Sequence, residues 1–220
     1  MIRGRLRPSR GAVLLVVVPC LLSLCGCTRA VDGRPTAGRP APLPASAEAL
    51  GELVVEEVAS GLPRLPDDEL HPPAGAKDAA DVAAYAADPG RELDVLEDYG
   101  YRYGWERFWG EGPALMTGVF VDQFDTRAGA AAYAADLARN DAEHYGAVLD
   151  EQPLDLPGGC RLLSVEEPAP DGRLTGPAAL VWCGSGAFSV GVTAVAGSVE
   201  EAEDEVRAVL AEQLDRLPPR

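Results

Sequence analysis

Histidine and lysine are scarce in this sequence of 220 residues, which limits the chemistry it can carry. His71 and His144 are the only histidines, and Lys77 is the only lysine. A zinc or calcium site needs three or more protein ligands that converge from fixed positions. Acidic residues lie near each histidine, but a solvated loop around His71 and a solvated helix end around His144 are the simpler interpretations. We therefore predict neither a metal nor a cofactor.

Catalytic motifs are also missing. The sequence has no Gly-rich phosphate loop, no metal-ligand spacing and no convincing pair of nucleophile and base. Ser185 lies between two glycines, but it lacks the outer glycines of a Gly-x-Ser-x-Gly nucleophile turn and falls between two expected strands. We predict no catalytic residue. A hydrolase that uses two carboxylates from distant positions stays open, because acidic residues are abundant.

Positive charge is low. The chain has 19 Lys and Arg against 35 Asp and Glu, which gives a formal net charge of −16. Nucleic acid and anionic lipid are both negatively charged and would repel such a chain. We therefore predict no nucleic-acid partner and no direct adsorption to an anionic membrane surface.

The first 27 residues contain the one long apolar run, from Gly11 to Leu24. This run is shorter than the ~20 residues of a membrane-spanning helix, and it contains Pro19. Four arginines precede it, as in the basic and apolar regions of a secretory signal. The run ends in the tetrad Leu-Cys-Gly-Cys at residues 24–27. The pattern indicates export, and a transmembrane anchor or an ordinary signal peptide cut nearby stay open.

The tetrad at residues 24–27 resembles the lipobox of bacterial lipoproteins, with Gly26 as the small residue before an obligatory cysteine. In that family the cysteine thiol receives a diacylglyceryl group, the peptide is cut before the cysteine, and the new terminus is often acylated as well, for example with palmitate. The resemblance implies a signal peptide over residues 1–26 and a lipid on Cys27. Two or three acyl chains anchor a protein stably. Cleavage would shift the net charge from −16 to −20, because the signal carries four arginines and no acid.

Composition and cysteine usage fit the same location. Nearly all basic residues are arginine, and alanine, glycine and proline are abundant, so the chain is similar to lipoproteins of Gram-positive actinobacteria. Of the five cysteines, Cys20 and Cys25 would leave with the signal and Cys27 would carry lipid. Cys160 and Cys183 would remain as a pair in an oxidising compartment, and we expect a disulfide between them. A metal pair or a catalytic thiol is disfavoured, because neither histidine is near a cysteine in sequence.

We expect three parts: the signal peptide at 1–26, the lipidated terminus and a flexible proline-rich tether at 27–45, and one α+β domain at 46–220. Proline-rich chain extends by up to ~3.1 Å per residue, so the tether would hold the domain away from the bilayer. The hydrophobic periodicity and turn signals predict an antiparallel sheet with helices packed mainly on one face, or a split α/β/α sandwich of the PsbP-like kind. Helices are expected at 46–59, 79–87, 91–98, 127–140 and 198–217, and strands at 101–109, 114–124, 160–165, 178–183 and 187–195.

The strand at 101–109 is the candidate binding element, because six of the thirteen aromatic residues lie between Tyr99 and Trp109. Read as a strand, it places four aromatic side chains and an arginine on one face: Tyr101, Tyr103, Trp105, Trp109 and Arg107. Such a face suits a sugar, a lipid or a peptide, and the arginine suits an anion. A buried core strand is the simpler interpretation.

The region from Asp88 through this strand to the helix at 127–140 resembles segments of uncharacterised secreted actinobacterial lipoproteins. The resemblance implies location and fold but no activity. We therefore expect a lipid-anchored, non-enzymatic domain on the outer face of the cell membrane, which binds a small ligand or an envelope protein. A structural or assembly role in the cell envelope is the alternative.

Overall fold

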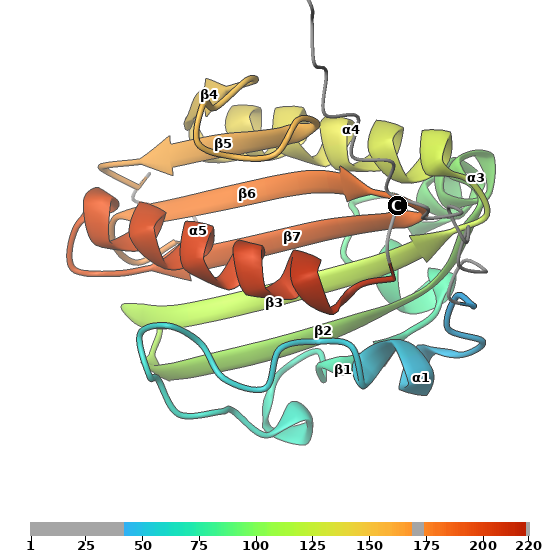
Figure 1. Cartoon of the computed structure of the whole chain (residues 1–220), viewed down its shortest axis with the longest axis horizontal. Coiled ribbons are helices and arrows are strands. Elements are labelled where there is room, and N and C mark those ends of the chain that lie inside the picture. The colour runs from blue at the N-terminus through green and yellow to red at the C-terminus, as the bar shows by residue number, and fades with distance from the viewer. Residues whose placement is uncertain (1–41, 169–173, 219–220) are drawn as a thin grey trace, which may run out of the picture. The chain divides into compact units, whose positions relative to one another are not determined.

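A computed structural model of the chain describes residues 42–168 and 174–218. The expected signal peptide, Cys27 and most of the expected tether lie outside the described residues. The described part contains a sheet of seven antiparallel strands with helices packed against it (Figure 1). The predicted α+β class and antiparallel sheet are confirmed. None of the described helices is both long and apolar enough to cross a membrane.

The strand order in the sheet is β1-β2-β3-β7-β6-β5-β4, with every neighbouring pair antiparallel. The longest strands, β2 and β3, form a hairpin. The strands are β1 (Gly75–Lys77), β2 (Tyr101–Gly112), β3 (Leu115–Phe124), β4 (Val148–Asp150), β5 (Cys160–Val165), β6 (Ala178–Ser185) and β7 (Phe188–Val195).

The helices begin at residues whose side chains accept hydrogen bonds from the first turn, as is typical of helix N-termini. These N-caps are Ser46, Asp78, Asp88, Thr126 and Ser198. The helices are α1 (Ala47–Gly51), α2 (Ala79–Ala83), α3 (Pro89–Tyr99), α4 (Arg127–Tyr145) and α5 (Val199–Arg216), with a short 3-10 turn, η1 (Asp67–Glu69).

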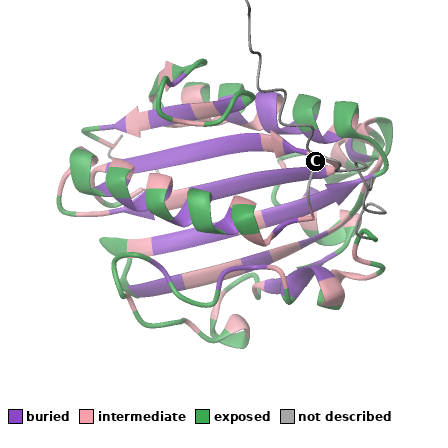
Figure 2. Ribbon diagram, viewed as in Figure 1, coloured by how far each residue is buried: buried purple, intermediate pink, exposed green. Residues whose placement is uncertain are grey.

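Helices cover both faces of the sheet, as in the α/β/α alternative expected from the sequence, rather than mainly one. Helix α5 packs on one face, where Val206 and Val209 belong to the same core cluster as the central valines of β3 and β7. Helix α4 packs on the other face, where Ala134 and Ala138 contact the cluster around Trp182. The first six residues of β6 are all buried, so this strand has buried side chains on both faces of the sheet (Figure 2). A helix therefore has to pack on each face to shield them from water.

The expected helix at 46–59 stops early, at Gly51. Residues 52–60 contain no further helix, yet they bury Val54, Val55 and Val58 against the α5 face of the sheet. Two consecutive buried residues do not fit a single helical stripe. A Cβ on Gly51 would lie 2.6 Å from the indole ring of Trp105, so the end of α1 packs directly on β2.

Helix α4 runs further than expected, to Tyr145, and Gly146 ends it with a positive φ of 63°. Glu143 and His144 near its end are exposed, in agreement with the expected solvated helix end, but Asp141 is half-buried. Its carboxylate accepts a hydrogen bond of 2.8 Å from Trp182 Nε1, and burial raises its pKa to about 6. The additional turn therefore joins α4 to β6.

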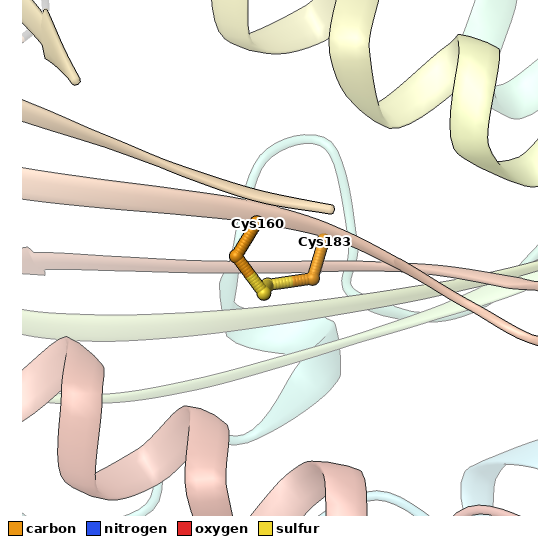
Figure 3. Close-up of a disulfide and its surroundings, with 2 residues drawn as sticks. All are labelled: Cys160 and Cys183. Atoms are coloured by element: carbon orange, nitrogen blue, oxygen red, sulfur yellow. A yellow bond between two sulfur atoms is a disulfide. The ribbon is translucent and has the colours of Figure 1, made fainter. Parts of the chain in front are cut away.

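The predicted disulfide is confirmed. Cys160 on β5 lies directly opposite Cys183 on β6, with their Cα atoms 4.1 Å apart and their sulfur atoms bonded (Figure 3). Both residues are buried in the cluster beneath α5. The bond thus joins two neighbouring strands inside the core.

Candidate functional site

Strand β2 does not keep its aromatic residues on one face. A register shift between Tyr101 and Tyr103, of the kind a β-bulge produces, turns Tyr101 to the opposite side. Tyr101 packs edge-to-face on Phe124 in the cluster on the α4 face. Tyr103, Trp105 and Trp109 contact the cluster on the α5 face. The predicted single face therefore holds for three of the four aromatic residues.

Three of the predicted aromatic residues use their polar atoms on backbone carbonyls. Trp109 is 1% exposed, and its Nε1 donates to Glu56 O at 3.3 Å. The Tyr103 hydroxyl donates to Pro44 O, and the Tyr101 hydroxyl donates to Lys77 O at 3.4 Å. These contacts fasten surrounding chain to the sheet. They leave Trp105 as the aromatic residue of the set that lines a groove.

The groove beside Trp105 has a volume of about 370 Å³. Small-molecule sites commonly occupy about 300–1,000 Å³, so the groove is near the small end of that range. It is formed by α1, the segment that follows α1, the chain before η1, and β2. Its lining residues are Glu48, Gly51, Glu52, Glu56, Arg64, Trp105 and Arg107. Two predicted binding residues, Trp105 and Arg107, thus lie in it together.

Arg107 fixes the segment that follows α1. Its Nη1 donates to Val54 O at 2.9 Å and to Val55 O at 2.7 Å, and its Nη2 donates to Gly51 O at 3.2 Å. Within the described part of the chain, no carboxylate forms an ion pair with it. Burial, with a smaller contribution from the charge of Arg64, lowers the pKa of Arg107. The guanidinium therefore has no direct ion-pair partner, although the carboxylates of Asp67 and Glu56 act on its charge at longer range.

Two hydrogen-bond donors of the groove residues are unused. Trp105 Nε1 and Arg107 Nε are buried, and neither has a partner among residues 42–168 and 174–218. Buried polar atoms are nearly always hydrogen-bonded in native proteins, so such an atom calls for an explanation. Both donors belong to alternate residues of β2, and both side chains line the same groove.

The remaining charges of the groove are of both signs. Arg64 pairs with Asp67 and lies 5.9 Å from the centroid of the Trp109 ring. Glu56 is 3.6 Å from Arg216. Glu48 and Glu52 are exposed and form no ion pair in the described part of the chain. The groove therefore presents two guanidiniums and three carboxylates around one indole.

A second polar group lies inside the molecule, on the α4 face. Lys77 Nζ is 3.2 Å from Glu106 Oε2, which also accepts a hydrogen bond of 3.0 Å from the Tyr85 hydroxyl. Burial raises the pKa of Glu106. Burial and the charge of Glu106 raise the pKa of Asp122 to about 7. These two carboxylates come together in the interior, and neither lines the groove beside Trp105.

Sequence reasoning missed this interior group because it expected no strand before residue 101. The structure makes Lys77 the last residue of β1, paired with Gly104 of β2. The available signal was the single lysine of the chain together with charged residues at inward-facing strand positions. In the described part, no three or more His, Cys, Asp or Glu residues are placed to hold a metal ion.

A second groove, of about 430 Å³, lies where the described chain begins and where α5 ends. Its walls are mostly proline and leucine side chains, with Arg216 as the one charged residue. None of the predicted site residues lines it.

Comparison with known proteins gives little. No family model matches the chain, and no curated protein matches it. Among solved structures, the extracellular domain of PknH from Mycobacterium tuberculosis is similar with a TM-score of 0.47 and 12% sequence identity, over 81% of this chain and 97% of that chain.

Proposed function

We propose that the protein is a lipoprotein, anchored through Cys27 to the outer face of the cell membrane, whose α+β domain binds a ligand without catalysing a reaction. Residues 1–26 and the lipobox-like tetrad at 24–27 support the anchor. The disulfide between Cys160 and Cys183 supports an oxidising compartment, because such bonds are rare in the cytosol.

The binding role rests on one observation, the groove that joins Trp105 and Arg107 to charged residues of both signs. Ligand sites combine an apolar surface with a few polar groups that fix orientation. The groove has this composition, whereas the converging carboxylates Glu106 and Asp122 are in the interior, 8% and 9% exposed. This arrangement favours the binding of a small ligand over hydrolysis by two catalytic carboxylates.

The anchor is tested by the mass of the protein purified from bacterial membranes. We expect a chain that begins at Cys27 and carries the added mass of a diacylglyceryl group, with or without an N-terminal acyl chain. Labelling with radioactive palmitate should disappear in Cys27→Ala. An unmodified Cys27, or labelling that survives the substitution, would reject the anchor.

The binding role is tested separately, with a panel of amino acids, peptides, sugars and organic anions and cations in a thermal-shift assay on the full-length protein. At least one class should raise the melting temperature, and Trp105→Phe should reduce that shift. Arg102→Gln is the matched control, because Arg102 is an exposed β2 residue outside the groove. If no class shifts the melting temperature, or if both variants respond equally, the groove is not a binding site.

A further inference from the structure

The groove beside Trp105 is lined by arginines and glutamates that lie close together. This mixture of charges favours some classes of ligand over others. We infer that it binds a small zwitterion, a compound with one carboxylate and one ammonium group such as the free ends of a short peptide. The inference rests on the proposed binding role of the same groove and names the chemistry of its ligand.

The two arginines of the groove favour a ligand with an anionic end. Arg107 donates its hydrogen bonds to three neutral backbone carbonyls and is half-buried, and only the more distant carboxylates of Asp67 and Glu56 act on its charge. Its Nε and the Nε1 of Trp105 are unused donors on neighbouring groove positions. Arg64 adds a second guanidinium. A ligand carboxylate in the groove would lie beside these two guanidiniums and add negative charge where no direct ion pair holds Arg107.

The glutamates of the groove favour a ligand whose other end is cationic. Glu48 and Glu52 are separated by one helical turn at α1, and both line the groove without a basic partner in the described chain. A simple anion would meet these carboxylates, and a simple cation would meet the two arginines. A zwitterion places each of its charges beside the opposite charge.

The size of the groove agrees with a short peptide. Its volume of about 370 Å³ is small, and the indole offers an apolar surface for the part of the ligand between its two charged ends. Gly51 packs against the ring, since a Cβ there would lie 2.6 Å from it, so only the rest of the half-buried indole faces the groove.

Calorimetry on the full-length protein tests the inference with three probes: dileucine, N-acetyl-dileucine and dileucine amide. Free dileucine should bind saturably. Each capped form loses one charge, and with it a charge-assisted contact, so each should bind at least about tenfold more weakly. Equal binding of a capped form and the free peptide would overturn the inference.

Two exposed groove residues assign the ends of the ligand. Glu52→Gln should abolish the preference for free dileucine over the N-acetyl form, and Arg64→Gln should abolish the preference over the amide. A merely structural role would weaken all three probes alike. Glu97→Gln and Arg102→Gln, exposed and outside the groove, should leave both preferences intact.

The two proposals fail differently. If dileucine does not bind, but another compound shifts the melting temperature in a manner that depends on Trp105, the zwitterion inference is wrong and the binding role stands. If no compound of the panel depends on Trp105, both are wrong.

Discussion

At the scale of single residues, the interior of the domain holds an unusual excess of acid. Lys77 balances Glu106, but Asp122 has no basic partner in the described chain. Its space comes from Gly104, where a Cβ would lie 2.2 Å from Asp122 Oδ1. The other groups that act on it are Glu106 and the Tyr101 hydroxyl. Burial and, to a smaller extent, the negative charge of Glu106 disfavour the ionised carboxylate, so the pKa of Asp122 lies well above the usual range for an aspartate.

The free energy of unfolding should therefore depend on pH through Asp122. Its pKa is raised from 3.8 to about 7. Between these values the unfolded chain has lost the proton that the folded protein keeps, so stability is lost as pH rises from about 4 to about 7. The full effect is on the order of 4 kcal/mol. Asp122→Asn should remove most of this loss, as urea unfolding at a series of pH values will measure.

Exposed Asp94 on α3 provides the control for this measurement. Asp94→Asn removes a carboxylate as well, but one in contact with water. We expect the pH profile of this variant to follow that of the natural protein. Some slope should remain even in Asp122→Asn, because burial also raises the pKa of Glu106 and Asp141. Identical profiles for the Asp122 and Asp94 variants would contradict the assignment.

At the scale of elements, residues 52–60 form no helix, and side chains distant in sequence form hydrogen bonds with their backbone instead. Gln213 of α5 contacts both Val55 N and Leu53 O, each at 3.0 Å. Glu205 of α5 accepts from Ser60 N at 2.8 Å. Together with Arg107 from β2, these side chains satisfy backbone groups that regular structure would otherwise pair. The segment is thus ordered by the sheet and α5 rather than by its own sequence.

Arg107→Lys should loosen this segment. Lysine keeps the charge but has a single nitrogen, so it cannot reach the carbonyls of Gly51, Val54 and Val55 together. We expect a loss of about 3 kcal/mol in the free energy of unfolding, since hydrogen bonds from charged donors contribute about 1.5–3 kcal/mol each and are not additive. Amide hydrogen exchange should become faster in residues 52–60 before the rest of the sheet.

Arg102→Lys is the matched control on the same strand. Arg102 pairs with Asp125 at 2.8 Å, but both side chains are more than half exposed, so water screens the pair and it contributes little to stability. If the two substitutions cost the same, Arg107 does not order the segment.

The elements that sequence reasoning placed well have local signals. Ser198 accepts a hydrogen bond from Glu201 N at the start of α5, and the alternation from Phe188 to Val195 matches β7. The predictions are wrong where contacts between residues distant in sequence determine the local structure. The helix at 46–59 is cut short by Trp105 and Arg107, β1 forms because β2 pairs with it, and a register shift turns Tyr101 away from the groove. The sequence identifies Trp105 and Arg107 as candidates but not the acidic groove residues Glu48 and Glu52, because no local pattern joins α1 to β2.

At the scale of the whole molecule, the disulfide contributes to the stability of the domain, and the proposed anchor would determine its location. Cys160 and Cys183 are 23 residues apart, which corresponds to about 3 kcal/mol of stabilisation through the unfolded chain. We expect the double substitution Cys160→Ala and Cys183→Ala to lower the free energy of unfolding by up to this amount while the fold is kept. Guanidinium unfolding measures the loss, and the reduced natural protein should show a similar one. No loss in either would mean that the cross-strand bond adds nothing to the pairing of β5 with β6.

The charge of the molecule makes the proposed anchor testable against a surface mechanism. A chain at −16, or −20 after cleavage of the signal, is repelled by anionic vesicles, and the repulsion weakens as salt screens it. Acyl chains insert regardless of salt. A form that begins at residue 28 should therefore stay in the supernatant when anionic vesicles are sedimented at low or physiological salt, whereas the lipidated protein should sediment at both. Neutral vesicles serve as the control for charge. Sedimentation of the residue-28 form at low salt, reversed by added salt, would show that a basic patch holds the protein to the membrane and that the lipid is dispensable.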